Sequence, residues 1–293
     1  MDSHVTQKSF IVVDGMEELH RFINRNSSRN SGKDKGLQLE RNKELARRIG
    51  ISEMKQHDER GKTGMKQRLK KISEHVWILP FDSPKDRPNL GYIKGENRAL
   101  AVDAGHSSSH VEDFYAELEA NGLPLPDLTV ITHWHWDHTF GMHAVHGRTI
   151  ALPETNRKLE QLREEMLSDP GWGRRFLKSD SSIIKEYAGG IPLVIVPADE
   201  ELSGDRDIDL GGLTARILRT ESPHTEDSLL VHVPEDRVLF IGDAQLGEFP
   251  SWRMDYDKLY ALGNKIREID TELIIDGHWT ACRKRDFLDE LGI

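Results

Sequence analysis

Four side chains that commonly bind metals occur within the short stretch Thr132-His133-Trp134-His135-Trp136-Asp137-His138. This stretch follows an apolar run, Leu128-Thr129-Val130-Ile131, which predicts a buried strand that ends where the chain turns. His133 and His135 lie two positions apart, so an extended turn can direct both imidazoles at one point. Asp137 and His138 are adjacent and point in different directions, which allows them to serve a second metal nearby. Imidazole and carboxylate together suit Zn(II), and also Fe or Mn.

Further segments place a His or an Asp after a predicted strand or at its end. They are Val102-Asp103-Ala104-Gly105, Ser222-Pro223-His224-Thr225, Phe240-Ile241-Gly242-Asp243 and Ile275-Asp276-Gly277-His278. In this order, and together with the His-x-His-x-Asp-His motif at 133–138, they resemble the metallo-β-lactamase superfamily. The resemblance covers about residues 72–293 and implies an α/β fold, an αββα sandwich with metals at one rim of its two sheets. Strand ends that meet at one edge of a layered sheet are where ligand sites usually form, which agrees with this architecture.

The resemblance also implies a role for each candidate ligand. The first metal would be held by His133, His135 and His224. The second would be held by Asp137, His138 and His278, with Asp243 as the bridge between the two metals. Asp103 would accept the proton of a ligand imidazole and so fix its tautomer. Two divalent ions are therefore expected, Zn(II) first, with Fe or Mn as alternatives.

Charge is distributed unevenly along the 293 residues, whose net charge is −10. Residues 1–71 carry 17 Lys and Arg against 10 Asp and Glu, a net of +7, so residues 72–293 carry −17. Residues 26–36 lack large apolar side chains and indicate a linker or disorder. We expect two domains, a basic and partly disordered extension (1–71) of unknown role and a catalytic domain (72–293). A nucleic-acid-binding arm is the alternative for the extension, but the excess charge without interleaved aromatics favours a solvated segment.

Short β-rich runs and amphipathic helices alternate after Ile72. The predicted strands are His75–Leu79, Gly91–Lys94, Ala99–Asp103, Leu128–Thr132, Arg148–Leu152, Leu193–Val196, Leu213–Leu218, Leu229–Val233, Val238–Ile241 and Leu273–Ile275. The predicted helices are Glu112–Ala120 and Tyr256–Ile269. Mixed strands and helices favour a layered α/β domain.

A helical insertion is predicted at about residues 154–189, with one helix that presents Leu159, Leu162, Met166 and Leu167 on one face and a second from about Arg174 to Tyr187. One hypothesis is a lid over the metal site, in which Trp172, Phe176 and Tyr187 shape an apolar pocket. The alternative is an ordinary outer helix pair that packs on the sheet. Trp134 and Trp136 are candidates for packing or for substrate contact, and Trp279 for a pocket wall.

Composition excludes several classes of protein. No run of 18 apolar residues is present, which argues against a membrane-spanning helix. The only cysteine, Cys282, excludes an internal disulfide and is expected to be structural. The opening residues lack the apolar region of a secretion signal, so we expect a cytoplasmic protein. The sequence allows a homo-oligomer, and no membrane partner is expected.

Two adjacent divalent metals generate a hydroxide near neutral pH and polarise a carbonyl oxygen. The sequence therefore predicts a hydrolase that acts on a small-molecule ester, lactone, thioester or amide. Asp137 is the candidate catalytic residue, because its carboxylate can orient the hydroxide and carry a proton to the leaving group. The alternatives are an iron-dependent dioxygenase and a nucleic-acid phosphodiesterase. Two complete ligand sets argue against the dioxygenase. The acidic catalytic domain argues against a nucleic-acid partner, and so against the phosphodiesterase.

Overall fold

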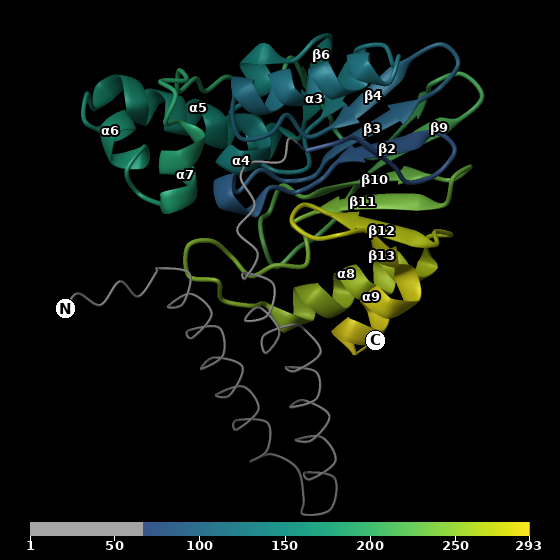
Figure 1. Cartoon of the computed structure of the whole chain (residues 1–293). Coiled ribbons are helices and arrows are strands. Elements are labelled where there is room, and N and C mark those ends of the chain that lie inside the picture. The colour runs from purple at the N-terminus through teal and green to yellow at the C-terminus, as the bar shows by residue number, and fades with distance from the viewer. Residues whose placement is uncertain (1–66, 293) are drawn as a thin grey trace, which may run out of the picture.

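Two β-sheets lie face to face with helices on their outer surfaces in the computed structural model, which describes residues 67–292 (Figure 1). The predicted αββα sandwich is confirmed. The predictions for the basic extension as far as residue 66 lie outside the residues that the structure describes. Lys70 and Lys71, which the charge pattern places in that extension, pair with Ile78 and Trp77 and so belong to the first sheet.

The first sheet has seven strands in sequence order from β1 to β7. Their bounds are β1 Lys70–Lys71, β2 Val76–Leu79, β3 Leu90–Lys94, β4 Ala99–Val102, β5 Leu128–Val130, β6 Arg148–Ala151 and β7 Glu200–Glu201. The strands from β1 to β4 pair antiparallel, and those from β4 to β7 pair parallel. The parallel part brings the carboxyl ends of β4 and β5 to the same edge, where Asp103 and the histidine-rich stretch follow.

The second sheet has six strands in the order β13-β12-β11-β10-β9-β8. Their bounds are β8 Arg206–Asp209, β9 Thr214–Arg219, β10 Leu229–Val233, β11 Val238–Gly242, β12 Leu273–Asp276 and β13 Cys282–Arg283. Only β11 and β12 pair parallel, so the chain leaves both at the same edge. Asp243 and His278 follow these two strands.

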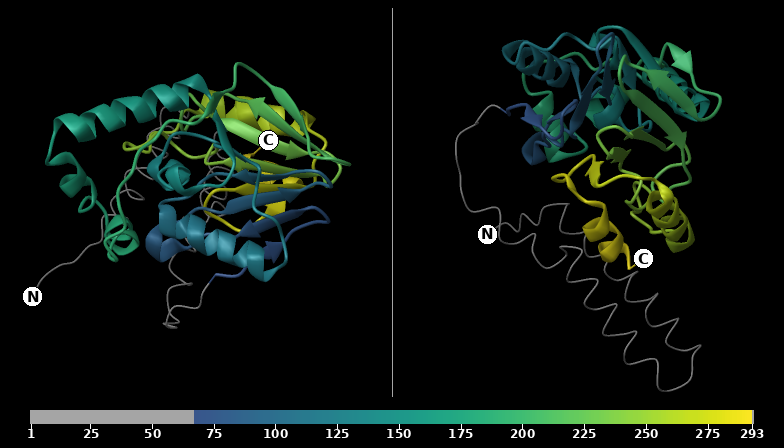
Figure 2. Two further views of the ribbon diagram at one scale, coloured as in Figure 1. Left: turned by 90° about the horizontal axis from the view of Figure 1, so that it is seen from above. Right: turned by 90° about the vertical axis from the view of Figure 1, so that its right-hand side faces the viewer.

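Side-chain alternation explains the layers. Leu229, Val231 and Val233 of β10 point into the core between the sheets, whereas Leu230 joins the outer core under the last two helices. These helices are α8 Tyr256–Glu268 and α9 Lys284–Leu291, and α3 Ser108–Ala120 covers the outer face of the first sheet. Figure 2 shows the helices on opposite sides of the paired sheets.

The helical insertion is present, but its second half differs from the prediction. The first helix is α5 Pro153–Ser168, and Leu167 is exposed instead of sharing the buried face with Leu159. The predicted helix from Arg174 to Tyr187 is two short helices, α6 Trp172–Phe176 and α7 Ser181–Glu186. They are separated because Asp180 caps α7, its carboxylate accepting a hydrogen bond from the Ser182 amide.

Several further elements differ from expectation. The predicted strand Leu193–Val196 is an irregular segment, whose apolar side chains pack under the insertion instead of joining a sheet. Helix α9 was not predicted. The short strands β1, β7, β8 and β13 were not predicted either, because two to four mostly polar residues carry little strand signal. Within residues 67–292, no helix has both the length and the apolar character needed to cross a bilayer.

Candidate metal centre

The histidine-rich stretch leaves β5 in extended conformation and then forms the single turn α4, Trp136–Thr139. His133 and His135 lie in the extended part, whereas Asp137 and His138 lie on the turn. The hydroxyl of Thr139 donates to the carbonyl of His135 at 2.9 Å, which ties the turn to the extended part. This local geometry directs the four side chains at two neighbouring points, as the spacing predicts.

The first donor set consists of His133, His135 and His224, and all three side chains are buried. His135 Nδ1 lies 3.2 Å from His133 Nε2 and 2.9 Å from His224 Nε2. His224 reaches the set from the loop between β9 and β10, where its amide donates to the Ser222 hydroxyl at 2.9 Å. The two sheets therefore each contribute to this set.

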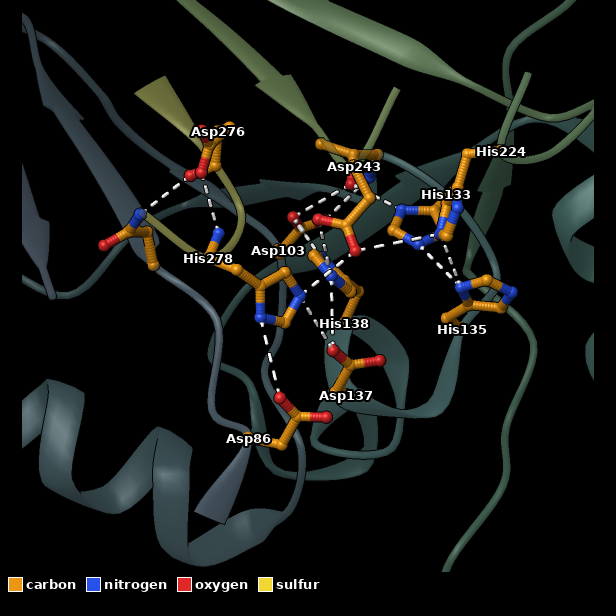
Figure 3. Close-up of polar contacts among 12 residues, drawn as sticks. Asp86, Asp103, His133, His135, Asp137, His138, His224, Asp243, Asp276 and His278 are labelled. Atoms are coloured by element: carbon orange, nitrogen blue, oxygen red, sulfur yellow. Dashed lines mark hydrogen bonds and ion pairs between the residues drawn. The ribbon is translucent and has the colours of Figure 1, made fainter. Parts of the chain in front are cut away.

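The second donor set consists of Asp137, His138, Asp243 and His278 (Figure 3). His278 Nε2 lies 3.2 Å from Asp137 Oδ2 and 3.0 Å from Asp243 Oδ2, and His138 Nε2 lies 3.5 Å from both Asp137 Oδ2 and Asp243 Oδ1. Asp243 Oδ2 also lies 3.7 Å from His224 Nε2. Asp243 thus faces both sets, which is the position expected of a bridge.

Contacts on the far side of the rings fix which nitrogen faces each set (Figure 3). His138 Nδ1 donates to Asp103 Oδ2 at 2.8 Å, and His224 Nδ1 donates to the Gly247 carbonyl at 2.7 Å. His133 Nδ1 donates to the Thr132 hydroxyl, which in turn donates to Asp103. The remaining ring nitrogens of His133, His138 and His224 are therefore the ones that face the two sets and could bind a cation. Asp103 holds the position predicted for it.

The arrangement suits cations, because its polar atoms otherwise lack partners. His138 Nε2 and Asp243 Oδ1 are buried without a hydrogen bond. In the first set, His133 Nε2 and His224 Nε2 both face His135 Nδ1, and one proton there can satisfy only one of them. Imidazole nitrogens and carboxylate oxygens at such spacing fit zinc, and also iron or manganese.

The electrostatics of the two sets differ. Burial holds the pKa of His133 well below its ordinary value and lowers the pKa of His135 to about 3, so the first set offers neutral imidazoles. Burial also opposes charge on His138, but the carboxylates of Asp137, Asp243 and Asp103 outweigh it and raise its pKa well above the ordinary value. Asp243 raises the pKa of His278 in the same way against the opposing effect of burial. In the second set, the two carboxylates therefore favour protonated imidazoles, and a cation would displace those protons.

Two glycines allow the strand ends to approach. A Cβ on Gly242 would lie 2.6 Å from Thr132 Oγ1, and one on Gly277 would overlap Asp243 Oδ1. Gly242 also has a φ of +51°, which disfavours a larger residue. The close contact of β11 with Thr132, and of the loop after β12 with Asp243, depends on these positions.

The tryptophan candidates fall into two groups. Trp136 packs against Phe249 and Phe176, and Trp172 stacks on Phe176, so both belong to the apolar cluster under the insertion. Tyr187 lies elsewhere, with its hydroxyl donating to the His106 carbonyl. Trp172, Phe176 and Tyr187 therefore do not shape one pocket, and the packing alternative describes them. Trp134 is half-buried beneath the Lys158 ammonium, and Trp279 is 52% exposed beside His278.

Sequence reasoning missed three residues around His278. Asp86 Oδ1 lies 3.7 Å from His278 Nδ1. Asp276 Oδ1 accepts the amides of His278 and Trp279, and burial raises the pKa of Asp276 to about 6. Asn89 donates to the backbone of the same loop. Asp276 could have been found from its place one residue before the Gly277-His278 pair, whereas the other two are distant in sequence.

A family model described as the metallo-beta-lactamase superfamily matches residues 84–278. A curated protein from Gallus gallus, named acyl-coenzyme A thioesterase MBLAC2, is 29% identical over 189 residues. The match covers 57% of this chain and 61% of that protein, so this chain spans less than two thirds of its length.

Solved structures share the fold at low identity. A metallo-beta-lactamase from Pontibacter korlensis is 17% identical, with a TM-score of 0.55, and the match covers 77% of this chain and 99% of that one. A metallo-beta-lactamase from Hirschia baltica is 18% identical, with a TM-score of 0.53 and coverage of 78% and 96%. At this level the likeness concerns the fold alone.

Proposed function

Because the chain belongs to the metallo-β-lactamase superfamily, we propose that it is a metal-dependent hydrolase whose substrate is a small-molecule thioester. The observation that carries this proposal is the position of Asp243, whose Oδ2 faces both donor sets. The thioester is favoured over the ester, lactone and amide because the Gallus gallus relative is named an acyl-coenzyme A thioesterase.

The donor atoms suggest how the chain would hold two cations, for which zinc is our first expectation. When bound, such a pair supplies a hydroxide from a shared water and polarises the carbonyl oxygen of the substrate. Asp137 would hold the second cation, and its carboxylate would accept a proton from the attacking water and pass it to the leaving thiolate. Its ionised state fits this role, because His138 and His278 keep its pKa below the ordinary value although burial opposes this.

The chain's own thiol does not compete for the role of nucleophile. Cys282 lies in β13 and packs against the outer core of the second sheet. Burial raises its pKa to about 12, so little thiolate is present near neutral pH.

A substrate panel tests the proposal. Zinc-reconstituted protein would be assayed with an acyl-coenzyme A thioester, a lactone, a β-lactam and a phosphodiester. We expect the thioester to be hydrolysed fastest, and His133→Ala to lose both turnover and one equivalent of zinc, whereas exposed His146→Ala keeps both. Preferential cleavage of the phosphodiester, or a requirement for iron with consumption of oxygen, would overturn the thioesterase assignment.

A further inference from the structure

The turn of residues 81–89, just before β3, contacts the loop that carries His278. Asn89 is 5% exposed, and its side-chain amide donates to the carbonyls of Asp276 and Trp279, each at 2.7 Å. Its backbone amide donates to the Gly277 carbonyl, also at 2.7 Å. One residue therefore fixes the loop on both sides of His278.

The same turn also contacts the imidazole itself. Asp86 ends the short 3-10 helix Ser83–Lys85 with a left-handed φ of 52°, and its carboxylate approaches His278 Nδ1 at 3.7 Å. Figure 3 shows Asp86 reaching the ring nitrogen that does not face Asp137 and Asp243. The ring of Phe81 meets the ring of His278 edge-on, with centroids 5.0 Å apart. The turn thus restricts both the loop and the rotation of the ring.

A buried ion pair anchors this turn to the helical insertion. Arg87 is 2% exposed, and its Nε donates to Glu186 Oε2 at 2.7 Å. Glu186 is the last residue of α7, and it also accepts a hydrogen bond from the Ser107 hydroxyl. Arg87 additionally donates to Asp113 of α3 at 2.8 Å. Arg87, which directly follows Asp86, is therefore held by side chains of two helices, α7 and α3.

Removing one partner of a buried ion pair is strongly destabilising, and the hydrogen bonds of the Arg87 guanidinium to Glu186 and Asp113 are directional, so together they hold the turn in one position. We propose that Arg87 and Glu186 are positioning residues for His278, which they orient through the turn 81–89. The inference rests on the proposed role of His278 as a ligand of the second cation. It gives the insertion a function that the sequence did not indicate: α7 supplies no ligand, but it sets the geometry of one.

The test compares the two donor sets within one protein. Zinc would be titrated into the metal-free full chain, wild type and Glu186→Gln, against a chromophoric chelator to obtain both dissociation constants. We expect the constant of the second set to rise about 10- to 100-fold, as for other outer partners of metal ligands, while that of the first set is unchanged. The visible spectrum of cobalt bound at the second set should change as well, which a role in stability alone would not produce.

Two further variants protect the test against misfolding. The double variant Arg87→Met/Glu186→Met removes both charges, so neither is left buried without the other. Asp86→Asn changes a side chain that is 26% exposed. Each should weaken the second set selectively. Asp169→Asn is the matched control, because it breaks an ion pair with Arg175 inside the same insertion and should change neither constant.

The outcomes separate this inference from the proposed function. Wild-type constants in folded Glu186→Gln, or equal weakening of both sets, would overturn the positioning role. A wild-type protein that binds neither zinc nor iron or manganese would instead refute the proposed function.

Discussion

The substitution Asp103→Asn isolates the contribution of one carboxylate to the metal centre. Asp103 Oδ1 accepts the Thr132 amide at 2.7 Å, and Oδ2 accepts the Thr132 hydroxyl at 2.9 Å and His138 Nδ1 at 2.8 Å. Asp103 has a φ of +66°, a backbone conformation that asparagine adopts readily. The variant therefore removes charge and one acceptor without straining the turn.

Either orientation of the new amide has a cost. If its NH2 group faces His138 Nδ1, that nitrogen must accept, and the ring proton moves to Nε2, where it blocks the second donor set. Loss of such an outer partner lowers metal affinity about 10- to 100-fold, which corresponds to about 1.4–2.7 kcal/mol. If the NH2 group faces Thr132 instead, the buried Thr132 amide loses its acceptor, which costs about 1–3 kcal/mol of folding stability.

The assay combines zinc titration of the metal-free protein with thermal unfolding. We expect a weakened second site or a lower unfolding temperature, and a smaller effect on the first site, because Asp103 reaches His133 only through the Thr132 hydroxyl. Asp205→Asn is the control, because Asp205 accepts a comparable bond from the Arg219 amide at the surface. If Asp103→Asn matched the wild type in both zinc constants and in stability, Asp103 would not fix the tautomer of His138.

Three further predictions follow from the geometry and charge of the centre. Gly277→Ala should abolish binding at the second donor set, because its methyl group would overlap Asp243 Oδ1. In the control Gly204→Ala, the new methyl group meets no atom, so this variant should bind two zinc ions. Metal analysis after dialysis distinguishes the two variants, and two retained ions in Gly277→Ala would contradict the geometry. Cys282 should react slowly with a thiol reagent at about pH 8 in the folded protein and rapidly after unfolding, because its pKa is raised to about 12; equal rates would contradict its burial. The affinity of the second donor set for zinc should increase with pH, because His138 and His278 have a raised pKa and their protons compete with the cation below it. Zinc titrations across about pH 6–8 test this prediction. An affinity that does not depend on pH would refute it.

The sequence predicts the centre well where each ligand directly follows a strand. The loop after β5 and the ends of β11 and β12 are recognisable because an apolar run stops at a His or an Asp. Their convergence then follows from the topology, since the parallel pairs β4–β5 and β11–β12 bring strand ends to one edge. This topology brings together the candidate ligands that follow β5, β11 and β12, and His224 joins them from the loop between β9 and β10. Their role as ligands stays a prediction.

The surroundings of the centre could not be predicted in the same way. Asp86 and Asn89 are ordinary turn residues in the sequence, and each contacts a partner almost the whole domain away along the chain. Leu193–Val196 has the composition of a strand, but burial under the insertion satisfies its apolar side chains without a ladder. The break between α6 and α7 does carry a signal, because Asp180 precedes two serines that favour a new helix start.

The distribution of donors over both sheets has a consequence for stability. His133 and His135 leave the first sheet, whereas His224, Asp243 and His278 leave the second, so each donor set joins the two. A cation that binds only the folded chain stabilises it by mass action, and here the bonds to it would span the interface between the sheets. In its absence, the second set avoids repulsion between Asp137 and Asp243 by holding protons on its imidazoles. A cation at the second set would therefore replace these protons as the partner that neutralises Asp137 and Asp243.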